Sequence, residues 1–166
     1  SARGLLQFMK ILEDQELLST RSQDPYVRTH PLNQNRISAI QQHTNNSEYT
    51  KKPTSNSNRI AYNRAKAKLF GFTQNLSRIL RIYPESKSSI ADIYARSIGY
   101  YRRPNIPKAI ELINILIKKK PSDPYFHELK GQIFFENGKV DLALSSYQKS
   151  VNLMPDSSLL RAQLGR

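Results

Sequence analysis

Residues 124–155 read PYFHELKGQIFFENGKVDLALSSYQKSVNLMP and predict two helices joined by a tight turn. Asp123 and Pro124 combine a capping carboxylate with a proline at the first helical position, which is typical of a helix start. Asn137 and Gly138 tolerate the left-handed backbone conformation that ends many helices. The segment is therefore expected to fold as a helical hairpin.

The same pattern occurs a second time, one fixed period earlier in the chain. Pro121 and Pro155 lie 34 residues apart, and each is preceded by an alanine twelve residues upstream, Ala109 and Ala143. A period of 34 residues with these markers is typical of the tetratricopeptide repeat (TPR), in which stacked helical hairpins form a solenoid. The C-terminal half therefore favours a protein-binding solenoid over a catalytic core.

Small and aromatic residues occupy the positions that the packing of a TPR hairpin requires. In the second repeat Gly131 and Ala143 permit a close approach of the two helices, and Phe134 and Tyr147 fill the space between them. The first repeat is looser, but it holds residues of the same kinds in register: Ser97, Tyr100 and Ala109. Two good repeats are fewer than the three usually needed for stability, so neighbouring helices should bury the remaining faces.

The net charge of +13 is concentrated in the middle of the chain. Residues 51–120 hold 16 Lys and Arg against three acidic residues, whereas the remaining residues hold ten of each. Such a field attracts anionic surfaces, although lysines spread over solvated helix faces would look the same in the sequence. No RNA-stacking or DNA-reading motif accompanies the charge, so we do not expect nucleic acid as the partner.

Composition also limits the membrane and metal chemistry of the chain. No run approaches the roughly 18 apolar residues of a membrane-spanning helix, so we expect no transmembrane segment. The absence of cysteine excludes disulfides and thiolate metal ligands. Because residue 1 opens directly into an amphipathic run at positions 5–12, we expect the chain to be a fragment of a longer protein.

No catalytic or metal-binding motif is complete within these residues. His127 and Glu128 begin a sequence like H-E-x-x-H, but the fifth residue is Gly131, which cannot supply the second ligand. His127 also stands where a TPR places a packing aromatic, so we interpret it as structural. His30 and His43 are too isolated to form a metal site, and no metal site or catalytic residue is predicted in the chain.

Residues 24–37, DPYVRTHPLNQNRI, resemble a segment of periplasmic zinc metallopeptidases of the BepA (YfgC) type, which carry a C-terminal TPR domain. In that family Tyr-Leu-Arg-Thr-His-Pro-Leu, followed by Arg-Ile, lies after the zinc-binding helices. The resemblance continues in order through three further blocks: AKLFGF at 67–72, YAR at 94–96 with YYR at 100–102, and PYFHELKGQIFFENGK at 124–139.

The resemblance implies that the chain belongs to a periplasmic protein whose zinc ligands lie upstream. The ligands in such proteins are two histidines of an H-E-x-x-H helix and a glutamate of a following helix. Zinc is then a cofactor of the presumed full-length protein, and these residues alone should bind no cofactor and be inactive. The resemblance further implies that His30 lies on a loop near the zinc cleft and that Arg36 anchors this loop. The missing catalytic domain of the same chain becomes one expected partner.

The expected fold class is all-α: a TPR-like helical-hairpin solenoid preceded by helices of a truncated metallopeptidase domain. Basic and apolar patterning predicts helices around 59–69 and 74–82, separated by Phe70-Gly71-Phe72. The segments expected along the chain are the end of the metallopeptidase domain at 1–43, a flexible polar linker at 44–58, a basic helical pair forming a degenerate TPR at 59–84, TPRs at 85–121 and 122–155, and a capping helix at 156–166.

The first helix of each TPR lines a concave groove, where aromatic residues mixed with a few polar groups suit an extended peptide. The predicted groove residues, some of which should instead pack between repeats, are Tyr94, Ile98, Tyr101, Arg102, Tyr125, Gln132, Phe135 and Glu136. We therefore expect the protein-interaction region of an envelope zinc metalloprotease, recruiting outer-membrane or misfolded protein substrates and assembly partners, or regulating the protease. The alternatives are a stand-alone TPR scaffold and a basic module that binds anionic surfaces or nucleic acid.

Overall fold

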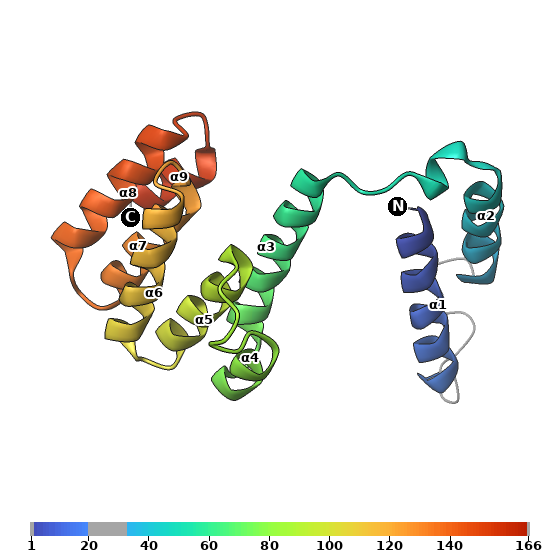
Figure 1. The fold of residues 1–166 in the computed structure, drawn as a ribbon, viewed down its shortest axis with the longest axis horizontal. Helices are drawn as coiled ribbons and strands as arrows, with labels where there is room; N and C mark the ends of the chain where they lie inside the picture. Colours follow the sequence, from blue (N-terminus) through green and yellow to red (C-terminus); the bar gives the residue numbers. More distant parts are fainter. Residues whose placement is uncertain (1, 20–32, 166) are drawn as a thin grey trace. The chain divides into compact units, whose positions relative to one another are not determined.

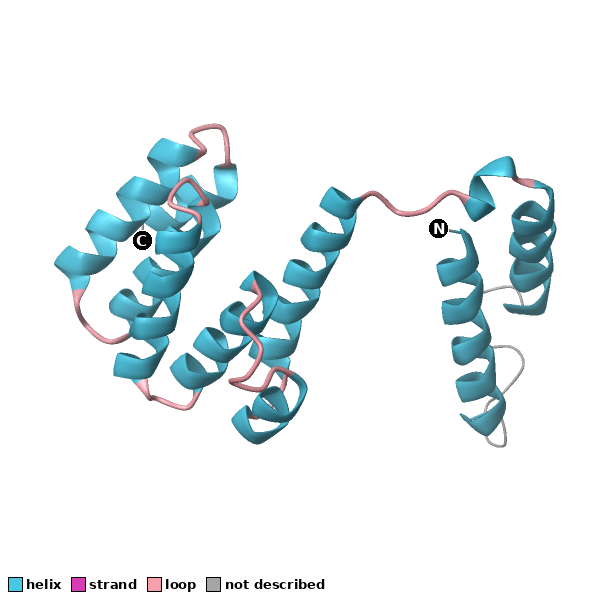
Figure 2. Ribbon diagram, in the orientation of Figure 1, coloured by secondary structure: helices cyan, strands magenta, loops and turns pink. Residues whose placement is uncertain are grey.

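The computed structural model describes residues 2–19 and 33–165, and these residues are helical with connecting loops and no strand (Figure 2). The prediction of an all-α helical-hairpin fold is confirmed. The chain divides into two compact units, Ser1–Asn56 and Ser57–Arg166, called unit 1 and unit 2 below. Figure 1 labels the helices of both units.

Unit 1 consists of two packed helices and a short 3-10 turn. Helix α1 (Ala2–Ser19) packs against α2 (Asn33–Asn46), and η3 (Glu48–Lys51) follows. Leu6 and Met9 lie three residues apart on one face of α1 and are buried, as is Thr44 of α2. The Thr44 hydroxyl donates a hydrogen bond to the carbonyl oxygen of Ile40 at 2.7 Å, which satisfies its buried polar group.

The range 44–58, predicted as a flexible linker, contains more helix than its composition indicates. Helix α2 continues to Asn46, η3 follows at once, and α3 (Asn56–Thr73) begins inside the range. The Ser47 side chain accepts a hydrogen bond from the backbone N–H of Tyr49 at 3.3 Å and caps η3. Short polar side chains that bury little surface can still satisfy the ends of helical turns in this way.

Unit 2 contains two helical hairpins with a helix pair before them and one helix after them. Its elements are α3, α4 (Leu76–Ile82), α5 (Ile90–Arg102), α6 (Ile106–Lys119), α7 (Pro124–Glu136), α8 (Val140–Leu153) and α9 (Ser158–Leu164). Helices α5 and α6 form one hairpin and α7 and α8 the other, while α6 packs on α7 and α9 on α8 (Figure 1). The two hairpins correspond to the predicted repeats.

Helix α3 runs through the break that the sequence predicts at Phe70-Gly71-Phe72. Gly71 is buried within the helix, and a Cβ atom placed on it would lie only 2.9 Å from the Cβ of Ile98. The glycine therefore serves the close packing of α3 on α5 instead of ending the helix.

Caps at the helix starts follow the local sequence signals. Ser89 and Asp92 form a reciprocal capping box at the start of α5. At the start of α7 the Asp123 carboxylate accepts a hydrogen bond from the N–H of Tyr125 at 3.2 Å, and Pro124 occupies the first turn. Gly138, with φ of 72°, occupies the left-handed conformation in the turn after α7, as its sequence position predicts.

The main core of unit 2 lies between the hairpins, where the rings of Tyr94 of α5 and Phe126 of α7 pack edge to face with their centres 5.3 Å apart. Hydroxyl groups of small residues also join the helices: the Ser97 hydroxyl donates to the carbonyl of Ala109 at 3.0 Å, and that of Ser150 donates to the carbonyl of Pro124 at 2.8 Å. The buried residues of this core are Ile93, Tyr94, Ile98, Tyr101, Ala109, Leu112, Ile113, Leu116, Phe126, Leu129 and Ile133.

Candidate functional site

The predicted groove residues of α5 lie mostly in the interior. Tyr94 and Ile98 are fully buried, Tyr101 is 8% exposed, and only Arg102 has an exposed side chain. Arg102 donates a hydrogen bond to the carbonyl oxygen of Phe72, the next-to-last residue of α3. Tyr94 and Ile98 belong to the core cluster formed by α5, α6 and α7, and α3 covers Ile98 from the other side at Gly71.

The predicted groove residues of α7 remain more accessible. Tyr125 and Gln132 are half-buried, Phe135 is 39% exposed, and Glu136 is exposed. Together with Arg102 they are the part of the predicted set that a ligand could reach. An exposed aromatic side chain beside polar groups is the composition found at protein-recognition surfaces.

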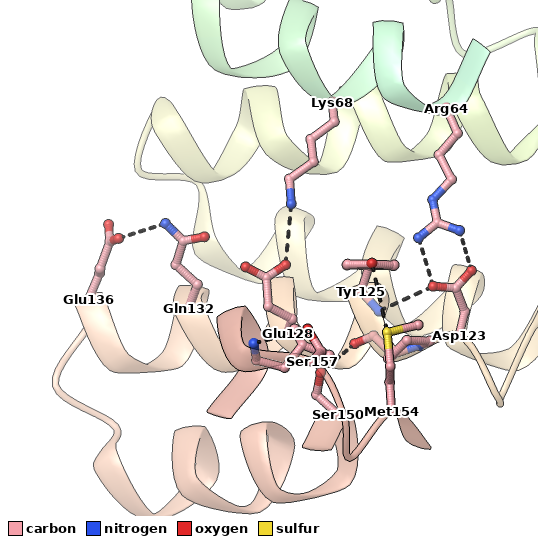
Figure 3. Close-up of polar contacts among 12 residues, drawn as sticks. Arg64, Lys68, Asp123, Tyr125, Glu128, Gln132, Glu136, Ser150, Met154 and Ser157 are labelled. Atoms are coloured by element: carbon pink, nitrogen blue, oxygen red, sulfur yellow. Dashed lines mark hydrogen bonds and ion pairs between the residues drawn. The ribbon is translucent and has the colours of Figure 1, made fainter. Parts of the chain in front are cut away.

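A hydrogen-bonded network joins the two hairpins at the C-terminal ends of α5 and α7. The Tyr101 hydroxyl donates to the Glu136 carboxylate, and the Gln132 side-chain amide donates to the same carboxylate at 3.0 Å (Figure 3 shows Gln132 and Glu136). Burial, and next the hydrogen bond with Glu136, raise the pKa of Tyr101 above its usual value. Tyr101 therefore stays protonated and holds the carboxylate in place.

The second feature of this surface is Arg64, which extends from α3 to the start of α7 (Figure 3). Its guanidinium binds the Asp123 carboxylate through both terminal nitrogens, with Nη2 2.7 Å from Oδ1. The guanidinium carbon also lies 4.8 Å from the ring centre of Phe126, 5.2 Å from that of Tyr125 and 5.8 Å from that of Tyr94. Arg64 thus combines a bidentate ion pair with three cation–π contacts.

Lys68 repeats this contact one helical turn further along α3. Its ammonium nitrogen lies 3.4 Å from Oε2 of Glu128 and 5.9 Å from the ring centre of Tyr125. The Glu128 side chain is only 8% exposed, whereas that of Lys68 is 37% exposed. Because residues four apart share a face of a helix, Arg64 and Lys68 present two cations in line to Asp123, the N-cap of α7, and to Glu128 within that helix.

Sequence reasoning assigned none of these four charged residues to the site. It interpreted Asp123 as a helix cap and Glu128 as part of an incomplete zinc motif, and it counted Arg64 and Lys68 in the central positive charge. Lys68 and Glu128 otherwise appeared only within the sequence blocks of the family resemblance. The four-residue spacing of Arg64 and Lys68 indicates that the two side chains share one face of a helix. No local pattern, however, pairs α3 with α7, whose contacting residues are 59 and 60 positions apart.

A cavity of about 300 Å³ lies beside this contact. The hydroxyl of Tyr94 is buried and has no hydrogen-bond partner among the described residues. Burial, and next the charge of Glu128, raise the pKa of Tyr94 above its usual value of 10.0. The residues lining the cavity are Ala61, Arg64, Ala65, Lys68, Tyr94 and Tyr125.

Tyr94→Phe is expected to leave stability at neutral pH unchanged or to raise it by about 1 kcal/mol, because it removes a buried hydroxyl to which the described residues offer no hydrogen-bond partner. The raised pKa means that the folded state keeps the phenol neutral at a pH where the unfolded chain already ionises it. The stability that the parent owes to this difference is fully present below the unfolded pKa of about 10 and is lost as pH rises toward the folded pKa. The variant should therefore lose less stability than the parent at alkaline pH, as measured by urea denaturation. A destabilised variant at neutral pH would show that the hydroxyl has a stabilising partner.

The remaining candidates from the sequence lie apart from this surface. His30 falls outside the described residues, and Arg36 has an exposed side chain on α2 of unit 1. A ring nitrogen of His127 lies 3.0 Å from the carbonyl oxygen of Pro121, which is a structural contact. Within the described ranges, no three His, Asp or Glu side chains gather as a metal ligand set.

None of the described helices is long and apolar enough to cross a membrane. Comparison of the chain with protein-family models, curated proteins and solved structures gave no match.

Proposed function

We propose that unit 2 is a TPR-type protein-interaction region, and that it recruits protein segments to an envelope zinc metallopeptidase of the BepA type. Two features support the proposal: helical hairpins that repeat with a period of 34 residues, and the sequence blocks that resemble that family. The proposed recruits are outer-membrane or misfolded proteins and assembly partners, and the proposed location is the periplasm. Zinc would act outside the described residues, so no catalytic step is assigned to them.

The observation that carries the binding role is the accessible face of α7. Phe135 is a large aromatic side chain left 39% exposed next to Glu136, and Gln132 and Tyr101 hold the carboxylate of Glu136. An aromatic anchor beside a fixed acceptor can bury an apolar side chain and accept a hydrogen bond from a peptide backbone. Such a surface fits a short extended or helical segment of another protein.

The alternative of an anionic-surface binder has less support from the structure. Arg64, Lys68 and Lys108, which contribute to the central positive charge, each pair with a carboxylate of the same chain. Asp123 and Glu128 thus bring two negative charges from outside residues 51–120 against the basic segment, so the local positive field is weaker than the count for residues 51–120 indicates.

Phe135→Ala is expected to weaken peptide binding about tenfold, because buried aromatic anchors dominate the energy of such surfaces. The probe is an array of overlapping peptides from mature outer-membrane β-barrel proteins, with affinities of the best binders measured by fluorescence anisotropy. Leu144→Ala serves as the matched control, since Leu144 is also an exposed apolar residue, 54% exposed, but lies on α8. Equal affinities of the parent and Phe135→Ala would contradict the proposed groove.

A further inference from the structure

Helix α3 is held in two different ways along its length. Near its C-terminal end, Phe70 packs edge to face on Tyr83 with the ring centres 5.6 Å apart. Phe72 packs in the same way on Tyr101, with the ring centres 6.5 Å apart. Toward the N-terminus its large apolar side chains face solvent: Ile60 is 49% exposed and Tyr62 is 65% exposed. The end of α3 is therefore anchored by aromatic packing, while its first half buries little apolar surface.

The first half of α3 is held instead by charges. Arg64, and Lys68 one helical turn later, contact α7 through ion pairs and through the rings of Tyr125 and Phe126. Ala67, which is fully buried between them, packs instead in a cluster with Ile79, Tyr83 and Ala95. A helix segment that docks through cations and small residues gains little hydrophobic free energy. Its attachment should therefore weaken as salt screens the pairs, and this segment should open more readily than the core.

The receiving surface, by contrast, is built into the hairpins. We call Tyr94, Asp123, Tyr125, Phe126 and Glu128 the α7 clamp. The side chains of Asp123 and Glu128 are only 10% and 8% exposed, and carboxylates at that depth are costly without a cationic partner. The three rings of the clamp surround one guanidinium. Its geometry selects a helical segment carrying Arg and Lys four residues apart.

We propose that the α7 clamp is a recognition site for a basic helical segment of a partner protein with Arg and Lys at positions i and i+4, and that the stretch of α3 carrying Arg64 and Lys68 is its built-in occupant. The proposal deepens the interaction role proposed above and rests on it. The partner segment would replace Arg64 on Asp123 and Lys68 on Glu128, and the adjoining cavity leaves room for side chains beyond those of Ala61 and Ala65. Occupation by α3 would keep the site closed to weaker ligands, because a ligand binds only the open fraction.

The test uses the full 166-residue chain and a fluorescein-labelled peptide of residues 56–73, NSNRIAYNRAKAKLFGFT, as the probe. Fluorescence anisotropy should show the peptide binding Arg64→Ala/Lys68→Ala at least about tenfold more tightly than the parent, because the variant lacks the competing internal cations. The affinity should fall as salt rises. Lys66→Ala removes an exposed cation from the same helix and should behave like the parent.

Two further measurements separate clamp binding from general attraction. A peptide with alanine at the positions of Arg64 and Lys68 should bind the double variant at least about tenfold more weakly, because it lacks both cations. In the parent chain, added probe peptide should speed hydrogen exchange of residues 56–66 but not of α7, which keeps the proposal testable even if the double variant unfolds. Equal affinity of the two peptides, or unchanged exchange at saturating peptide, would overturn the clamp. If Phe135→Ala bound the outer-membrane peptides as tightly as the parent, while the clamp measurements gave the expected results, the broader proposed function would be contradicted instead.

Discussion

Gly131→Val should destabilise unit 2 by about 3 kcal/mol, because the added side chain has no space between the helices of the second hairpin. A Cβ atom at Gly131 would lie 2.6 Å from Cδ1 of Tyr147 and 3.0 Å from its Cγ. The Tyr147 ring is 5% exposed and packs in one cluster with Phe134 and Ala143, so it cannot swing aside without opening that cluster. Helices α7 and α8 would have to separate.

Urea denaturation followed by circular dichroism measures this effect. Gly4→Val is the matched control, since it adds the same side chain to a helix of unit 1 at a position with nothing within 4 Å of the new Cβ. Because valine has a higher helix propensity than glycine, the control should be neutral or slightly stabilising. If both variants unfolded at the same urea concentration as the parent, the close packing of Gly131 on Tyr147 would be disproved.

Arg96→Met should lower the free energy of unfolding by about 3 kcal/mol, because it removes several charge-assisted hydrogen bonds at a buried site. The Arg96 side chain is 5% exposed, and its Nη1 lies 3.1 Å from the carbonyl oxygen of Tyr83, 2.6 Å from that of Pro84 and 3.0 Å from that of Lys87. Methionine keeps much of the apolar volume but leaves these three carbonyl groups without this donor.

Arg103→Met is the control for Arg96→Met, because Arg103 is exposed at the end of the same helix and its loss should change stability little. The decisive readout is hydrogen exchange in the loop between α4 and α5, which Arg96 fastens to α5. This loop should lose protection in Arg96→Met well before the hairpins do. Protection equal to the parent in that loop would show that Arg96 does not hold it.

The hairpins could be predicted because their signals are local. Asp123 and Pro124 start a helix, Gly138 ends one, and Gly131 faces Tyr147 across the same hairpin, all within a single repeat. The bounds of α3 could not be predicted in the same way. Gly71 is a helix breaker by local propensity, but packing against Ile98 of another helix outweighs that preference.

The candidate site was predictable only in part. The sequence placed the predicted groove on α5 and α7, and the structure leaves two of its α7 residues, Phe135 and Glu136, exposed. It predicted that some of these residues pack between repeats, but it did not identify Tyr94 and Ile98 as the fully buried ones. Whether an aromatic side chain on such a helix is open to a ligand depends on what covers it, and no periodicity within α5 contains that information.

The amino-acid sequence by itself determined the helical hairpins, their period and the turn and cap residues, because these depend on interactions between residues within a few turns or within one repeat. Only the tertiary structure decided the partners of the central charges. Arg64 meets Asp123, and Lys68 meets Glu128, across 59 and 60 residues of chain. The reason is physical: an ion pair requires only that two side chains meet in space, so its position follows from how the helices pack and leaves no periodic mark in the sequence.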